Sequence, residues 1–135
     1  MSDKNFIDNF LAEPYLCRFA LNRGERAPLI RPVWYLWEDG QLMMSTSGDA
    51  SHIKAIRKDP NISVCIDKAS PPYAALVAEG KAELVQGLGT DHALLRRLAD
   101  RYLPAERVDG FMQRPMAQIE RVRIIVEPQR WTVWN

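Results

Sequence analysis

The sequence has little cysteine, almost no excess charge of either sign and no apolar run long enough to cross a bilayer. Its 18 basic and 17 acidic side chains leave a formal net charge of +1, so we expect neither nucleic acid nor an anionic membrane as a partner. Asp3 lies where a signal peptide would have a basic and then an apolar stretch. These absences predict a cytoplasmic protein.

Motifs for metal binding and for nucleotide or acyl chemistry are also missing. Cys17 and Cys65 have no C-x-x-C spacing and occur in apolar segments, so we expect reduced core residues, with a disulfide or a nucleophile as lesser alternatives. His52 and His92 have no further ligand at metal-site spacing, and no metal site is predicted. The sequence has no G-x-S-x-G, P-loop or G-x-G-x-x-G motif, so catalytic residues stay unknown and a cofactor would have to supply the chemistry.

Residue patterns typical of β-strands recur along most of the sequence. Hydrophobic residues make up 47% of the 135 residues, which is typical of one folded domain, here assigned to 1–135. Alternation and β-branched content predict strands over 15–21, 29–37, 42–46, 62–67, 73–85, 123–126 and 131–133. Helical spacing predicts helices before Pro14, within 47–59 and after a Thr90 cap, the last with Arg96, Arg97 and Arg101 facing solvent. This order predicts an antiparallel β-barrel with peripheral helices.

Two glycines and four tryptophans add detail to this reading. Asp39-Gly40 is typical of a tight hairpin, and Gly80 inside a strand indicates a bulge or a close approach. Trp34, Trp37, Trp131 and Trp134 all lie in or beside predicted strands. Core packing, dimer packing or the border of a planar ring system would each account for them.

The segment 47–54 is the strongest candidate for a binding site. Ser51 is placed to cap a helix whose first free N–H groups and dipole favour an anion. His52 and Lys54 in the first turn oppose that dipole unless a bound anion such as phosphate compensates. An ordinary serine-capped surface helix is the alternative, and the spacing alone leaves both open.

Two ordered segments carry a resemblance to a known family. They are APLIRPVWYLWEDGQLMMSTSGDASHIKAIRKDPNISVCID and YAALVAEGKAELV, and RWTVWN near the end adds to them. The chain resembles the pyridoxamine-phosphate-oxidase-like family of FMN-binding split β-barrels. The resemblance implies a flavin site in three parts. The strand along the ring would be Arg31, Pro32, Val33 and Trp34, and the neighbouring strand would be Met44, Ser45, Thr46 and Ser47. The phosphate would be held by Ser51, His52 and Lys54. It also implies a homodimer in which C-terminal tryptophans such as Trp131 complete the partner's site.

The resemblance implies an FMN-dependent oxidoreductase in which flavin N5 transfers hydride to a substrate that the sequence does not name. A deazaflavin-dependent reductase and a non-catalytic flavin- or haem-binding protein are the alternatives. His52 occupies a position where the family often has lysine or arginine, so phosphate affinity is expected to be weaker or pH-dependent. The end of the chain, 130–135, lacks the basic motif that grips a substrate phosphate in authentic pyridoxamine-phosphate oxidases, so that activity is not expected.

Overall fold

The computed structural model describes residues 2–135, with side chains from Lys4 onward, so the predicted capping of the first helix by Ser2 or Asp3 lies outside the described side chains. Seven strands form one antiparallel sheet in the order β2-β1-β5-β6-β7-β4-β3. The strands are β1 (Cys17–Arg23), β2 (Arg26–Val33), β3 (Leu36–Glu38), β4 (Gln41–Ser47), β5 (Asn61–Asp67), β6 (Ala75–Val85) and β7 (Arg121–Trp134). The helices are α1 (Ser2–Leu11), α2 (Ser51–Lys58), α3 (His92–Tyr102), α4 (Ala105–Met112) and the 3-10 helix η1 (Pro115–Ala117).

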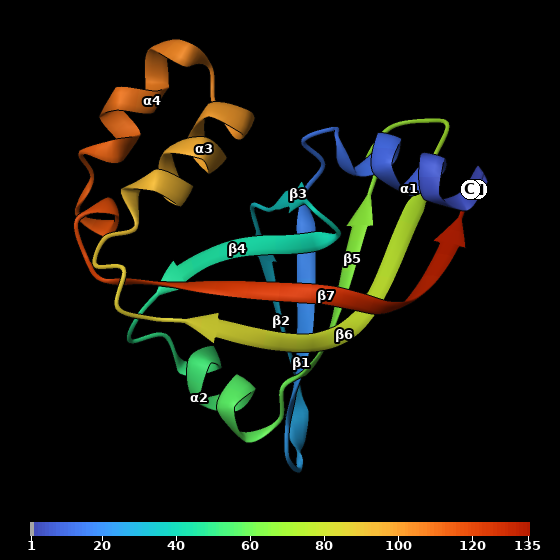
Figure 1. The fold of residues 1–135 in the computed structure, drawn as a ribbon, viewed down its shortest axis with the longest axis horizontal. Coiled ribbons are helices and arrows are strands. Elements are labelled where there is room, and N and C mark those ends of the chain that lie inside the picture. Colours follow the sequence, from blue (N-terminus) through green and yellow to red (C-terminus); the bar gives the residue numbers. More distant parts are fainter. Residues whose placement is uncertain (1) are drawn as a thin grey trace.

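The sheet is strongly curved but not closed, because no pairing joins β2 to β3 within the described residues. In Figure 1, β4, β7 and β6 cross the direction of β1 and β5, and the pair α3 and α4 lies beyond one end of them. Alternate residues of the strands fill the interior, as the burial of Phe19, Leu42 and Ile124 shows. The predicted antiparallel split barrel with peripheral helices is thus confirmed.

The predicted strand over 29–37 is wrong at its centre, where the chain forms two strands instead of one. The backbone N–H of Tyr35 points to the Tyr102 hydroxyl at 3.4 Å instead of to a neighbouring strand. The Tyr35 hydroxyl donates to the Leu11 and Glu13 carbonyls at 3.2 and 3.0 Å. Trp34 stacks on Tyr102, so tertiary contacts of both residues take the chain out of the sheet. The Asp39-Gly40 hairpin that follows is confirmed, with φ of 53° and 75°.

The bulge predicted at Gly80 is confirmed, and it explains a second difference from the prediction. The β6–β7 register shifts between Glu79 and Gly80, with Pro128 opposite Gly80. Proline has no N–H for a ladder, and a bulge tolerates this loss. The two separate tail strands predicted on either side of Pro128 are therefore wrong, because β7 continues through that residue.

The third helix also differs from its prediction. It begins at His92 after Asp91, which has φ of 46°, and Thr90 is not its cap. Asp91 holds this position because both of its carboxylate oxygens bind Arg123. Arg101 does not face solvent as predicted, since its guanidinium donates to the main-chain carbonyls of residues 11–13. The sequence reading also missed α4.

The two cysteines are free and lie on neighbouring strands, β1 and β5. Cys17 is buried, and burial raises the pKa of its thiol to about 12. Cys65 is only half-buried, so the expectation of two core cysteines is met at Cys17 alone. Across residues 2–135, no helix is long and apolar enough to cross a membrane.

Candidate functional site

A cavity of about 670 Å³ opens between the barrel and the α3–α4 unit. Its lining comes from β1, β2 and the start of α2, from the end of β4, and from the helical unit and the start of β7. Its lining is mostly apolar with a few polar groups, which is typical of cofactor and ligand sites. The lining residues are Leu16, Phe19, Arg31, Pro32, Val33, Trp34, Ser45, Thr46, Ser47, Ala50, His52, Leu95, Leu98, Phe111, Met116, Ile119 and Arg121.

Eight of the twelve residues implied as flavin-binding line this cavity: Arg31, Pro32, Val33, Trp34, Ser45, Thr46, Ser47 and His52. The other four lie elsewhere. Met44 is fully buried in the main core because it points to the opposite face of β4 from Ser45. Trp131 packs edge-on against Trp37, with ring centroids 5.6 Å apart. Ser51 and Lys54 line a separate cavity beside α2.

The helix start at Ser51 differs from the sequence expectation. Ala50 is the N-cap, Ser51 is the first helical residue, and no side chain caps the helix. Alanine contributes no capping oxygen, so the first N–H groups of α2 have no side-chain acceptor from the cap position. The neighbouring cavity, about 500 Å³, is basic on balance, since Arg23, Arg26, Lys54 and Lys58 line it together with one acidic residue, Asp59.

His52 points into the protein and not to solvent. Its ring lies edge-on to Phe19 with centroids 5.4 Å apart, and its Nε2 lies 2.5 Å from the Thr46 hydroxyl oxygen. Burial, and then the positive charge of Arg31, hold the pKa of His52 below its usual value. Histidine is therefore neutral here at pH 7, and the permanent positive charge of this wall belongs to Arg31.

Trp34 gives the cavity a flat aromatic surface. Its ring stacks on Tyr102 at 6° between planes and 5.2 Å between centroids, and Phe111 lies 5.2 Å away on a tilted plane. Leu95 and Leu98 of α3 extend this apolar wall. A planar ligand of several fused rings would find dispersion contacts along these groups.

Sequence reasoning missed Arg121, which lines the same cavity as Arg31. Its side chain is buried, and its Nε and Nη1 donate to the Ser45 hydroxyl and the Met116 carbonyl at 3.1 and 3.2 Å. Burial lowers the pKa of Arg121 from its ordinary value, although a guanidinium stays charged in proteins. An arginine at the start of a strand gave no signal by itself, because its burial depends on contacts with β4 and η1.

Comparison with known proteins now defines the family. The family model described as pyridoxamine 5'-phosphate oxidase matches residues 4–135. The chain belongs to the pyridoxamine 5'-phosphate oxidase family. No curated protein matches the sequence.

Solved structures similar to this family member share its fold at low sequence identity. An F420 reductase matches with a TM-score of 0.76 and 22% identity over 93% of this chain and 94% of that chain. A Listeria innocua protein, provisionally described as a pyridoxamine 5'-phosphate oxidase, matches with a TM-score of 0.73 and 18% identity over 98% of both chains. A FAD- and haem-binding protein of Mycobacterium smegmatis matches with a TM-score of 0.69 and 16% identity over 96% of this chain and 69% of that chain.

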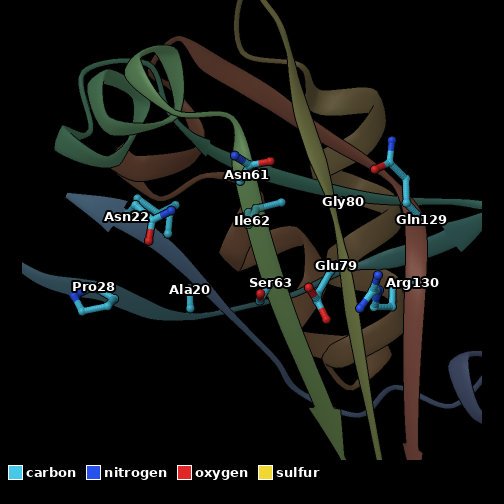
Figure 2. Close-up of a pocket in the computed structure, with 11 residues that line it drawn as sticks. Ala20, Asn22, Pro28, Asn61, Ile62, Ser63, Glu79, Gly80, Gln129 and Arg130 are labelled. Atoms are coloured by element: carbon cyan, nitrogen blue, oxygen red, sulfur yellow. The ribbon is translucent and has the colours of Figure 1, made fainter. Parts of the chain in front are cut away.

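This pyridoxamine 5'-phosphate oxidase family member has another cavity, of about 700 Å³, on the outer face of the sheet. Figure 2 shows Ala20, Ser63, Glu79 and Arg130 in a row across four neighbouring strands. The cavity contains none of the twelve residues implied as flavin-binding and has no aromatic side chain. It therefore lacks the flat apolar surface of the first cavity. Among the described residues, no group of three or more His, Cys, Asp or Glu could hold a metal ion.

Proposed function

We propose that this protein is a flavin-dependent oxidoreductase that holds FMN in the cavity between the barrel and the α3–α4 unit. One observation carries the proposal: the cavity combines a flat aromatic wall with two arginines, Arg31 and Arg121, and its lining has no aspartate or glutamate. The charge of the whole chain is only +1, so this positive site is a local feature. A planar, apolar ring with an anionic tail has the matching chemistry.

The phosphate of the cofactor belongs at the start of α2. Arg31, Ser47 and His52 approach this point from the flavin cavity, and Ser51 and Lys54 approach it from the basic cavity beside it. The N–H groups of the first turn of α2 add hydrogen-bond donors and the positive end of the helix dipole. The ring system then extends toward Trp34, Leu98 and Phe111.

When bound, the flavin supplies hydride transfer, and the protein supplies position and electrostatics. Trp34 and Phe111 would contact the ring system, and Leu95 and Leu98 would exclude water from it. No lining residue is an acid, and His52 is engaged with Thr46. We therefore assign the lining residues to binding and orientation, with no proton transfer by a side chain.

A deazaflavin coenzyme is the second candidate, and the basic cavity is the observation that favours it. Arg23, Arg26, Lys54 and Lys58 would suit an anionic tail longer than that of FMN. A structural neighbour is named F420 reductase, although at 22% identity this likeness supports only the shared fold. A carrier that binds flavin or haem without turnover is the non-enzyme alternative.

We also propose a homodimer with a flavin site at each side of the interface, in the cytoplasm. Ile30 and Trp134 are large apolar residues with 61% and 62% of their surfaces exposed, which a partner subunit would cover. Trp131 is turned toward Trp37 of its own chain, so Trp134 is the better candidate to reach the partner's flavin. Light scattering should give twice 15.5 kDa. Ile30→Lys with Trp134→Lys should give monomers that bind FMN more weakly, and a monomer that binds FMN tightly would contradict the shared site.

The absorption spectrum of the purified protein tests the proposed cofactor. Spectra are recorded before and after addition of FMN, deazaflavin coenzyme or haem, and the perturbed bands identify the ligand. We expect FMN bands to shift and the other two ligands to stay unperturbed. Steady-state reduction of an electron acceptor then separates an enzyme from a carrier. Binding of haem alone would overturn the proposal.

A further inference from the structure

Arg121 is a buried cation whose direct partners are neutral. Arg121 is 6% exposed, and its guanidinium donates to the Ser45 hydroxyl and the Met116 main-chain carbonyl. Neither acceptor carries a charge. A buried charge without a counter-charge is costly, so proteins rarely keep one unless it binds an ion or a ligand.

The nearest carboxylate is already engaged. Asp91 acts on Arg121 through space, but its Oδ2 accepts from Arg123 Nε at 3.0 Å and its Oδ1 from Arg123 Nη2 at 2.8 Å. This is a two-pronged ion pair, with the Asp91 side chain 3% exposed. Two arginines and one aspartate leave a surplus positive charge, and it faces the cavity at Arg121.

Apolar side chains line the cavity beside Arg121. Met116 and Ile119 flank it on the cavity wall, and they are 45% and 42% exposed, although both are large hydrophobic residues. Leu95 and Leu98, which are buried, line the same cavity. The cavity therefore offers one guanidinium whose hydrogen-bond partners are neutral, and exposed apolar side chains in the same lining.

We propose that Arg121 binds the carboxylate of a small apolar carboxylic acid, which makes such acids the substrate class of this site. This inference rests on the proposed function, which assigns the flavin phosphate to Arg31 and the start of α2. The fork of a guanidinium matches the two oxygens of a carboxylate, and a desolvated charge strengthens that contact. Met116 and Ile119 contact the apolar body of the acid.

Calorimetric titration of the FMN-loaded protein tests this, with benzoate as the probe and benzamide as its neutral match in shape. Wild type should bind benzoate at least roughly tenfold more tightly than benzamide, the ratio that one charge-assisted contact provides. Arg121→Met should bind benzoate and benzamide equally, both when it is saturated with FMN and when it is free of flavin. Ser45→Ala is the matched control: it removes a hydrogen bond of Arg121 but keeps the charge, and it should retain the preference for benzoate.

Two results would overturn the inference: no benzoate binding by wild type, or an unchanged preference for benzoate over benzamide in Arg121→Met. Arg121→Lys covers the case in which the methionine variant does not fold. It keeps the charge without the fork, so the preference should shrink but persist. If wild type fails to bind FMN, the proposed function fails, and the same titrations on the flavin-free protein still decide the role of Arg121.

Discussion

Replacement of Gly80 by alanine should destabilise the sheet at the β6–β7 bulge. A Cβ at this position would lie 2.7 Å from the Glu127 carbonyl oxygen and 3.1 Å from Val126 Cγ1. The oxygen belongs to the backbone of β7, so it cannot rotate away as a side chain would. The two longest strands of the sheet would have to separate locally.

The size of the effect follows from two opposing terms. Overpacking of this kind costs about 1–3 kcal/mol. Alanine also lowers the backbone entropy of the unfolded chain, which stabilises the folded protein by about 0.4–1 kcal/mol. We therefore expect Gly80→Ala to lower the free energy of unfolding by about 1–2 kcal/mol.

Urea unfolding followed by tryptophan fluorescence measures this difference, and Gly110→Ala is the matched control. Gly110 lies in α4 with no atom within 4 Å of an added Cβ. Alanine is the better helix former by about 0.5–1 kcal/mol, so the control should be as stable as wild type or more stable. A Gly80→Ala protein with wild-type stability would refute the close approach of the two strands.

Three further predictions concern the site and the core. The pKa of His52 in the folded protein lies below its unfolded value of 6.5, so the free energy of unfolding should fall as the pH drops below about 6.5. Urea unfolding of His52→Gln should show a flatter dependence of this free energy on pH. At pH 8, iodoacetamide should modify Cys65 slowly and Cys17 hardly at all in the folded protein, and mass spectrometry of both cysteines alkylated equally fast would contradict this. Lys54→Glu should weaken FMN binding more than Ser51→Ala, since it loses a charged contact of about 1.5–3 kcal/mol and adds repulsion; equal affinity of Lys54→Glu and wild type would place the phosphate elsewhere.

Local chemistry predicted the parts of the fold that local geometry decides. The Asp39-Gly40 hairpin needs two positive φ angles, and an Asp-Gly pair is typical of turns with such angles. The break at Trp34 and Tyr35 has no such signal. It depends on Tyr102, a residue far along the chain, which accepts a hydrogen bond from one of them and stacks on the other.

The candidate site divides in the same way. The order and spacing of the motifs predicted that Arg31 and the residues after it line one cavity. This prediction succeeded because consecutive residues of one strand stay close together in space. Order and spacing did not separate Ser51 and Lys54 from the flavin cavity, since the direction of each helical side chain depends on how α2 is rotated against β1. Arg121 required the position of η1 and the ion pair of Asp91, which are both tertiary features.

The affinity of FMN for three proteins tests the central claim most directly. Flavin fluorescence is followed while wild type, Arg31→Ala and Lys68→Ala are titrated. Lys68 lines neither the proposed flavin cavity nor the basic cavity. Its replacement by alanine removes one positive charge, as Arg31→Ala does, and so serves as the control. We expect wild type and Lys68→Ala to bind at micromolar concentration or below, and Arg31→Ala to bind roughly tenfold or more weakly, as loss of a charge-assisted phosphate contact predicts. No quenching of flavin fluorescence by wild type at tens of micromolar, which is weaker than roughly 7 kcal/mol of binding, would contradict the account.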